Sequence, residues 1–290
     1  MVTAATASRR RTFVKELARQ APRRRRYSNG MPYTVPMAVT NPTQRFSSRV
    51  QDYVRYRPTY PPEVIALLRD ECGLTKDSIV ADIASGTGIF TKLLLENGNR
   101  VFGVEPNAEM RHAGEEFLAD YPRFKSLAGT AEATTLADHS IDVVTAAQAA
   151  HWFDRAKARR EFVRILKPRG WTALIWNERK TDSTAFLRDY EQLLLNYGTD
   201  YKEVRHERTT DEIAGFFAPS PYQSRVFEMR QECDYAGLQG RLVSSSYTPQ
   251  RGDEKYEPML AELKRIYEKH QSGGGVALEY ATRVFYGRLA

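Results

Sequence analysis

Blocks of apolar and polar positions alternate through the middle of the chain and predict strands and helices in turn. Short apolar runs bounded by turn residues predict strands, and segments with apolar residues three or four positions apart predict helices. The expected strands are 78–83, 101–104, 124–128, 141–146 and 171–176, and the expected helices are 63–71, 89–96, 108–120 and 155–166. This alternation predicts an α/β fold with a doubly wound, mostly parallel sheet.

The pattern changes in the second half of the chain. Residues 181–219 carry apolar side chains at helical spacing, namely Phe186, Tyr190, Leu193, Leu194 and Tyr197. We interpret the segment at about 180–220 as a small helical cap inserted into the fold. Strand-like patterns return at 222–235 and 276–286, with a helix expected at 257–271. The two closing strands are expected to pair in antiparallel fashion.

A small-residue turn at 84–88 is the main chemical signal. It follows the strand at 78–83, precedes a helix and holds Gly86 and Gly88. Glycines in such a turn let a ligand approach the backbone, and Glu105 after the next strand can accept hydrogen bonds from ribose hydroxyls. The combination predicts a site for a nucleoside-bearing cofactor.

Two cofactor classes compete for that site. A nicotinamide cofactor favours a third glycine where Thr91 stands, so that its pyrophosphate rests on the helix N-terminus. Asp82 would repel a pyrophosphate but would suit the ammonium of a methionine moiety. These residues favour S-adenosylmethionine and leave a nicotinamide-dependent oxidoreductase as the alternative.

Five segments resemble motifs of the class I S-adenosylmethionine-dependent methyltransferases. They are 80–90, 104–110, 129–132, 140–144 and 166–171. The resemblance extends from about Phe46 to the C-terminus and favours the small-molecule branch that includes trans-aconitate and ubiquinone-biosynthesis methyltransferases. The family's first motif has glycine where this chain has Ala84, and an adenine-contacting aspartate is common where Thr130 stands. The resemblance implies a Rossmann-like, seven-stranded sheet.

The resemblance also implies which residues contact the cofactor. A lid at 44–62 contains Tyr53 and Arg57 in a segment similar to one that lies across the cofactor in this branch. Arg57 would pair with the methionine carboxylate or with an acidic substrate; the alternative is a solvated loop. The implied cofactor-binding residues are Tyr53, Arg57, Asp82, Ala84, Ser85, Gly86, Thr87, Gly88, Glu105, Pro106, Met110, Thr130, Ala131, Glu132 and Gln148.

The methyl acceptor is expected beyond the carboxyl ends of the strands, where open α/β sheets bind ligands. His151 follows the strand at 141–146 and is the catalytic candidate, as a base or as a hydrogen-bond donor. A histidine that only shapes the loop is an equal alternative. A base is needed only when the acceptor atom carries a proton. The candidate acceptor contacts are Trp152, Arg179 and Tyr247.

Charge separates the N-terminus from the rest of the chain. The 290 residues have a formal net charge of +7, but residues 1–36 hold nine Arg or Lys and one Glu, so the remainder carries −1. We interpret 1–36 as a disordered basic tail or a start-site artefact, with translation beginning at Met37 or Met31. An organelle transit peptide has a similar composition. Residues 37–290 are expected to form one methyltransferase domain with its lid and cap.

The remaining composition narrows the classes of protein. No apolar run approaches the ~20 residues that span a bilayer. Cys72 and Cys233 form no disulfide framework, and no Cys/His cluster has metal-ligand spacing. We expect a cytoplasmic monomer or homodimer that acts on a small-molecule acceptor. The non-enzymatic alternative binds nucleic acid through the basic arm. The near-neutral remainder of the chain argues against it, because phosphate binding needs a basic surface.

Overall fold

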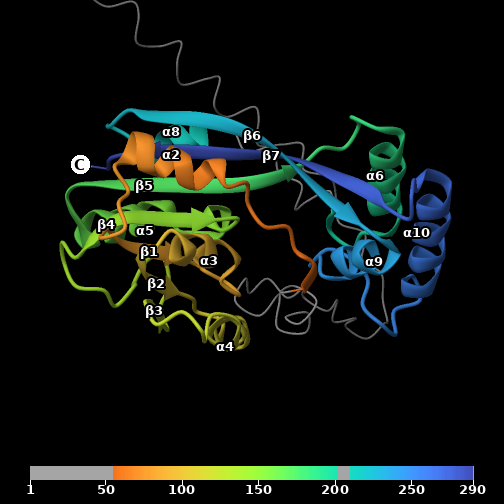
Figure 1. Cartoon of the computed structure of the whole chain (residues 1–290), viewed down its shortest axis with the longest axis horizontal. Helices are drawn as coiled ribbons and strands as arrows, with labels where there is room; N and C mark the ends of the chain where they lie inside the picture. Colours follow the sequence, from red (N-terminus) through yellow and green to blue (C-terminus); the bar gives the residue numbers. More distant parts are fainter. Residues whose placement is uncertain (1–54, 202–209, 290) are drawn as a thin grey trace, which may run out of the picture. The chain divides into compact units, whose positions relative to one another are not determined.

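The computed structural model describes residues 55–201 and 210–289 (Figure 1). Within these residues, a seven-stranded sheet has the order β3-β2-β1-β4-β5-β7-β6. The strands are β1 (Ile79–Ile83), β2 (Arg100–Val104), β3 (Phe124–Leu127), β4 (Ile141–Ala147), β5 (Leu166–Arg179), β6 (Tyr222–Cys233) and β7 (Val276–Gly287). β1 to β5 pair in parallel, and β7 is antiparallel to both β5 and β6. The expected doubly wound, mostly parallel sheet is confirmed.

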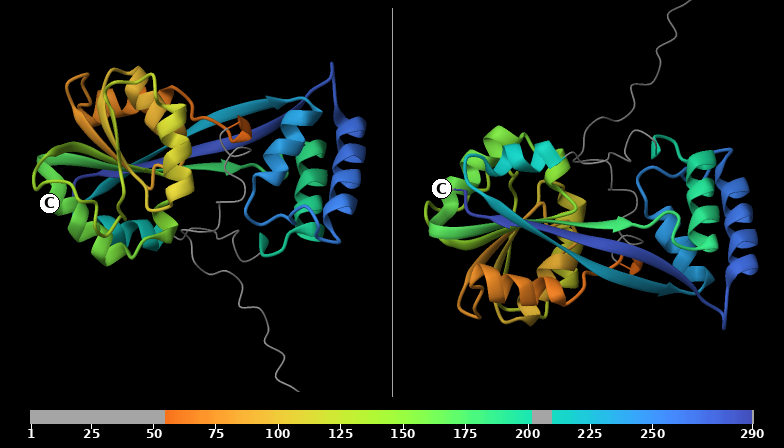
Figure 2. Two further views of the ribbon diagram at one scale, coloured as in Figure 1. Left: turned by 90° about the horizontal axis from the view of Figure 1, so that it is seen from below. Right: turned by 90° about the horizontal axis from the view of Figure 1, so that it is seen from above.

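Helices cover both faces of the sheet (Figure 2). One face packs against α2 (Glu63–Cys72) and α3 (Ile89–Glu96), and the other against α5 (Arg155–Ile165) and α8 (Thr210–Phe217). Neighbouring residues of a strand point to opposite faces, so Val80 packs with the first pair of helices and Ala81 with the second. Burial on both faces explains why β1 and β4 are apolar along nearly their whole length.

β6 and β7 carry a third apolar cluster, in addition to the two on the faces of the sheet. They are longer than β1 to β3 and run beyond them to a group of three helices (Figure 1). These helices are α6 (Ala185–Tyr197), α9 (Tyr235–Val243) and α10 (Tyr256–His270). Their inner side chains pack together with Cys233 of β6 and Leu278 of β7. We call α6, α9, α10 and the adjoining ends of β6 and β7 the cap.

The cap differs from the insertion expected at about 180–220. Of that stretch, α6 belongs to the cap, whereas α8 packs on α5, with the rings of Phe162 and Phe216 5.8 Å apart. The strand expected to reach Tyr235 ends at Cys233. Asp234 then caps α9, because its carboxylate accepts the Gly237 N–H at 2.7 Å. The cap is therefore assembled from segments on both sides of β6.

β5 also differs from its expected span of 171–176. The α5 helix ends at Ile165, and β5 starts at once at Leu166 and continues to Arg179. Its register against β4 shifts between two pairs, Ile141 with Leu166 and Val143 with Trp171. The extra residues bulge out of the ladder, so a turn-like sequence lies inside a strand.

Another helix, α4 (Ala108–Phe117), packs beside β3 and ends before the expected Asp120. No helix in residues 55–201 or 210–289 is long and apolar enough to cross a bilayer, and no group of three or more His, Cys, Asp or Glu side chains there can hold a metal ion. Cys72 and Cys233 are buried free thiols. Burial raises the pKa of Cys72 to about 12 and that of Cys233 to about 11, so neither is a reactive thiolate.

Candidate active site

A pocket opens at the carboxyl ends of β1, β4 and β5, on the side toward the cap. It encloses about 580 Å³ of space, including its mouth. Four parts of the chain line it: the lid, the turn after β1, the end of β4 with β5, and the cap. The lining residues are Arg57, Pro58, Tyr60, Asp82, Ala84, Ser85, Gly86, Thr87, Ile89, Phe90, Ala147, Gln148, Asn177, Arg241 and Tyr280.

The turn between β1 and α3 has a backbone that suits glycine. Ala84, Gly86 and Gly88 have φ of 53°, 58° and 83°, all in the left-handed region. Gly88 caps α3, and a Cβ built there would lie 2.6 Å from Leu118 Cδ1. Ala84 adopts the left-handed conformation with a methyl group, which is unfavourable by about 1–2 kcal/mol. The turn thus holds a strained backbone against the pocket.

Asp82 sits near the end of β1 and lines the pocket while being only 1% exposed. Its two carboxylate oxygens accept hydrogen bonds from the hydroxyls of Thr91 at 2.7 Å and Thr145 at 2.8 Å. Burial raises its pKa to about 6, the two hydroxyl bonds oppose that rise, and the nearby Glu105 adds to it. A fixed carboxylate whose pKa is raised to about 6 therefore lines the pocket.

Glu105 at the end of β2 joins that strand to the glycine turn. One oxygen accepts the Gly86 N–H and the other the Asn107 N–H, each at 2.9 Å. Burial raises its pKa, and these backbone bonds and Arg111 oppose the rise. Asn107 in turn caps α4 by accepting the Met110 N–H at 2.8 Å. A carboxylate oxygen has two acceptor directions, so each can still take one hydroxyl.

Thr87 supplies a buried hydroxyl to the pocket. Its Oγ1 has no hydrogen-bond partner among the described residues, although the residue is only 1% exposed. A buried hydroxyl left without a partner disfavours the folded state by about 1–3 kcal/mol. This atom therefore marks a place where a polar ligand would be stabilised.

The described part of the lid is fastened to the cap. Arg57 Nη2 donates to the Ser244 carbonyl at 3.0 Å, and Gln231 Nε2 donates to the Tyr56 carbonyl at 3.1 Å. A Cβ built on Gly240 of α9 would lie 2.2 Å from Cδ2 of Tyr56, so the ring packs directly on that glycine. The lid and α9 therefore form one wall of the pocket.

Asn177 of β5 links three neighbours around the pocket. Its Nδ2 donates to the Thr59 carbonyl at 2.8 Å, its Oδ1 accepts the Thr282 hydroxyl at 2.6 Å, and its carbonyl accepts Gln148 Nε2 at 2.8 Å. Gln148 has φ of 58°, an uncommon conformation for a residue with a side chain. Strain of this kind gathers at functional sites.

Comparison with known proteins decides the family. The sequence model of a family described as "Methyltransferase domain" matches residues 81–174. An uncharacterized methyltransferase of Mycobacterium tuberculosis is 38% identical over 251 residues, which cover 84% of this chain and 96% of that protein. An uncharacterized methyltransferase-like protein of Schizosaccharomyces pombe is 32% identical over 252 residues, 86% of this chain and 97% of that protein. The chain belongs to the class I S-adenosylmethionine-dependent methyltransferases.

Solved structures agree on the fold. A type II methyltransferase from Anaeromyxobacter dehalogenans matches with a TM-score of 0.61 at 20% identity, covering 81% of this chain and 98% of that one. A methyltransferase from an antibiotic biosynthesis pathway of Anabaena variabilis matches at 0.57 and 21%, covering 84% and 100%. Membership of this family argues against the nicotinamide-dependent oxidoreductase. It also shows that the protein is an enzyme, so the non-enzymatic alternative is wrong. The basic arm at 1–36 lies outside the described residues.

In the structure, the predicted cofactor-binding residues fall into three groups. Arg57, Asp82, Ala84, Ser85, Gly86, Thr87 and Gln148 line the pocket. Tyr53 lies outside the described residues. The remaining predicted residues are not among those that line the pocket in the described part of the chain: Gly88, Glu105, Pro106, Met110, Thr130, Ala131 and Glu132.

The segment with Thr130 makes local contacts. The Thr130 hydroxyl accepts the Glu132 N–H at 3.2 Å, Ala131 is buried in the core, and Glu132 accepts the Asp154 N–H at 2.9 Å. The adenine contact suggested for this segment stays a prediction.

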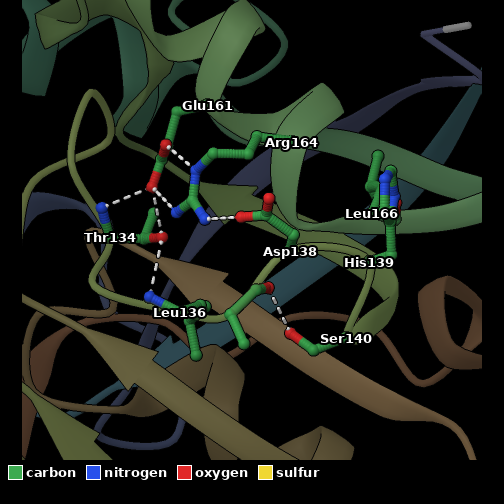
Figure 3. A network of polar contacts seen from close by, with 9 residues as sticks. Thr134, Leu136, Asp138, His139, Ser140, Glu161, Arg164 and Leu166 are labelled. Atoms are coloured by element: carbon green, nitrogen blue, oxygen red, sulfur yellow. Dashed lines mark hydrogen bonds and ion pairs between the residues drawn. The ribbon is translucent and has the colours of Figure 1, made fainter.

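A polar network fixes the loop that follows (Figure 3). Glu161 of α5 accepts both the N–H and the hydroxyl of Thr134, at 2.7 and 2.6 Å. Arg164 donates to both oxygens of Glu161 and also to Asp138. Arg164 is the main cause that lowers the pKa of Glu161 to about 2. The loop between 130 and β4 is thereby tied to the helix that covers the sheet.

His151 and Trp152 lie in the short helix η3 (Ala150–Trp152) after β4. His151 is exposed, its ring lies 4.7 Å from that of Trp152, and it lines a separate small pocket with Arg155 and Trp176. His151 is therefore not among the described residues that line the main pocket, and its role as a base stays a prediction.

Arg179 and Tyr247 lie inside the cap region. Arg179 forms an ion pair with Glu191, lies 3.1 Å from the Tyr201 hydroxyl and stacks over the ring of Tyr190. The Tyr247 ring lies 4.9 Å from that of Tyr201. Neither residue is among those that line the main pocket. Their acceptor contacts also stay predictions.

Eight of the residues that line the pocket were not predicted as site residues, and four of these have polar side chains, Tyr60, Asn177, Arg241 and Tyr280. Asn177 had a usable signal, because it is polar and directly follows the apolar run that ends at Trp176. Arg241 and Tyr280 come from the cap, in segments that lie far along the chain from the strands at the pocket. No local sequence pattern marks these two residues.

Proposed function

We propose that this enzyme transfers a methyl group from S-adenosylmethionine to a small-molecule acceptor. The observation that carries the proposal is one pocket that combines a glycine turn, the carboxylate of Asp82 and a wall supplied by the lid and cap. The wall supplied by the lid and cap supports a small-molecule acceptor, because a macromolecule would need an open approach to the turn.

The residues around the turn fit this cofactor. Glu105 retains acceptor directions for ribose hydroxyls, and Asp82 would hold the methionine ammonium. Arg57 would pair with the methionine carboxylate. Thr87 Oγ1, a buried hydroxyl with no described partner, suits a polar group of the ligand. When bound, the cofactor would supply an electrophilic methyl group.

The enzyme's own residues then orient the acceptor and exclude water. Positioning two reactants supplies much of the rate in a displacement of this kind. Tyr60 packs edge-on against Phe90, with ring centroids 5.1 Å apart, and both line the pocket as apolar wall. His151 would act only if the acceptor atom carries a proton, and the turnover of His151→Ala with the natural acceptor tests that role.

Calorimetry with S-adenosylmethionine and S-adenosylhomocysteine tests the cofactor assignment. We expect binding of both and no binding of NADH. Glu105→Ala should weaken binding by about 2 kcal/mol, roughly 30-fold, through loss of charge-assisted hydrogen bonds. Glu116→Ala removes an exposed carboxylate from α4 and should bind like the wild type. Equal affinity of Glu105→Ala and the wild type would remove Glu105 from the cofactor site, provided that both proteins melt cooperatively.

A further inference from the structure

The cap contributes a buried cation to the pocket. Arg241 of α9 is only 7% exposed and lines the pocket. Its Nε donates to the Tyr280 hydroxyl at 3.3 Å, and its Nη1 donates to Ser245 Oγ at 2.9 Å. Both partners are neutral. Within residues 55–201 and 210–289, no carboxylate forms an ion pair with Arg241, and Nη2 has no hydrogen-bond acceptor there.

A second arginine of this region shows the difference. The Arg179 side chain is 9% exposed, close to the exposure of Arg241, but it forms an ion pair with Glu191. Buried charges are normally paired, because removal of a charge from water is strongly unfavourable. Arg241 therefore carries a charge that the described cap leaves uncompensated, at the surface of a ligand pocket.

The charges of the pocket indicate which ligand faces Arg241. Among the residues that the structure describes, the charged side chains that line it are Arg57, Asp82 and Arg241. Under the proposed function, Asp82 takes the methionine ammonium and Arg57 the methionine carboxylate. The cofactor then has no anionic group left for Arg241, so the remaining cation faces the other substrate.

We propose that Arg241 binds an oxyanion of the methyl acceptor, so that the enzyme selects small molecules carrying a carboxylate or phosphate. This inference rests on the proposed function. Two neutral partners, Tyr280 and Ser245, hold the guanidinium by Nε and Nη1 and leave Nη2 for the ligand. A guanidinium recognises the planar or tetrahedral oxygens of such anions better than an ammonium does.

The oxyanion that Arg241 binds is not the group that accepts the methyl group. In the transfer, the acceptor atom gives a lone pair to the methyl carbon, and the pair of the broken carbon–sulfur bond stays on sulfur. An arginine bonded to the attacking oxygen would stabilise the charge that the reaction removes, which raises the barrier. Arg241 therefore fits an anionic group elsewhere in the acceptor, and that group keeps its charge in the product.

The natural acceptor provides the test. The full-length enzyme and labelled S-adenosylmethionine are incubated with small molecules, below about 1 kDa, extracted from the organism that makes this protein and separated on an anion exchanger at pH 8. We expect the acceptor and its methylated product both to be retained by the resin. An acceptor in the unretained fraction, or a product that loses retention, would overturn the proposal. No transfer to any fraction, with cofactor binding intact, would count against the proposed function as well.

Variants of Arg241 then assign the contact. With the retained fraction as substrate, Arg241→Gln should raise the KM at least tenfold, and Arg241→Lys should lie between it and the wild type. Both should keep the wild-type affinity for S-adenosylhomocysteine. Arg265→Gln removes an exposed arginine of α10 and should match the wild type in both measurements. An unchanged KM in Arg241→Gln would overturn the proposal. Tenfold weaker binding of S-adenosylhomocysteine by this variant would also overturn it, and would assign Arg241 to the cofactor instead. If Arg241→Gln does not fold, Arg241→Lys and the resin experiment decide.

Discussion

Ala84 occupies a backbone position in the pocket that favours glycine. Its φ of 53° brings the methyl group close to the backbone, which is unfavourable by about 1–2 kcal/mol. Glycine relieves that strain but loses more entropy on folding, by roughly 0.5–1 kcal/mol. We expect Ala84→Gly to stabilise the enzyme by up to about 1 kcal/mol, a rise in Tm of roughly 2–4 °C. Urea and thermal unfolding measure both quantities.

A second Ala→Gly change provides the control for Ala84→Gly. Ala113 lies inside helix α4, where glycine is less stable than alanine by about 1 kcal/mol. Ala113→Gly should therefore lower the Tm while Ala84→Gly raises it. If both variants lose the same stability, the turn stores no strain at Ala84.

Asp82 should make cofactor binding depend on pH. Burial is the main reason that its pKa is raised to about 6, so the carboxylate is charged above that pH and neutral below it. The methionine ammonium needs the charged form. We expect the affinity for S-adenosylhomocysteine to fall as the pH drops from 7 to 5. Calorimetry across this range, with buffers of different protonation enthalpy, would also detect the proton released on binding.

Asp82→Asn separates this effect from other titrations. The hydroxyls of Thr91 and Thr145 can rotate to accept as well as donate, so the amide keeps both contacts. The variant should bind more weakly at pH 7 and lose the dependence between pH 7 and 5. A wild-type pH profile in Asp82→Asn would show that another group governs binding.

At the scale of elements, the network around Glu161 ties a loop to helix α5 (Figure 3). The pKa of Glu161 is lowered from 4.5 to about 2, so its charged form stabilises the fold. That contribution is complete above pH 4.5 and is lost as the pH falls toward 2. Each unit of pKa shift is worth 1.36 kcal/mol, so Glu161→Gln should reduce stability at pH 7 by about 3 kcal/mol. Urea unfolding at pH 7 and pH 3 measures the difference.

The loss from Glu161→Gln should shrink at pH 3, because the Glu161 carboxylate of the unfolded chain, with its ordinary pKa of 4.5, is then mostly protonated while that of the folded protein is still mostly charged. Glu262 provides a matched control on α10, where it pairs with the exposed Arg265. Exposed pairs contribute about 0–1 kcal/mol, so Glu262→Gln should change little at either pH. An equal loss in the two variants would mean that the network in Figure 3 has no special role.

The sequence predicted some elements far better than others. β1 and β4 were expected within about one residue of their ends, because burial on both faces makes them continuous apolar runs. α9 was missed. It is short and contains Gly237 and Gly240, two poor helix formers. Gly240 is there because the Tyr56 ring packs on it, a contact between residues far apart in sequence.

The same contrast holds for the candidate site. The glycine turn and its carboxylates come from adjacent strands, so spacing alone placed Asp82 and Glu105 at one edge of the sheet. Arg241 reaches that edge only because β6 and β7 extend past the other strands and carry the cap. No pattern within one segment predicts that Arg241 lies beside the glycine turn, because this proximity depends on the tertiary structure.

At the scale of the whole molecule, a ligand in the pocket would contact the lid, the glycine turn and the cap together. A ligand that binds only the folded state stabilises it by about 2.7 kcal/mol at 100 times its Kd. We therefore expect S-adenosylhomocysteine to raise the Tm by roughly 5–10 °C at that concentration. Hydrogen exchange should slow both in the turn at 84–88 and in α9, because Arg57 and Tyr56 connect the cofactor side of the pocket to that helix.

The edge strand β3 is the internal reference for the exchange measurement, because none of its residues lines the pocket. Its amides should exchange at the same rate with and without ligand. Arg57→Gln should keep the protection of the turn at saturating ligand but reduce that of α9, since the bond to the Ser244 carbonyl at the end of this helix is lost. Protection confined to the turn in the wild-type enzyme would show that the cap takes no part in cofactor binding. Equal slowing of β3 would instead point to a global change in stability, which carries no information about the cap.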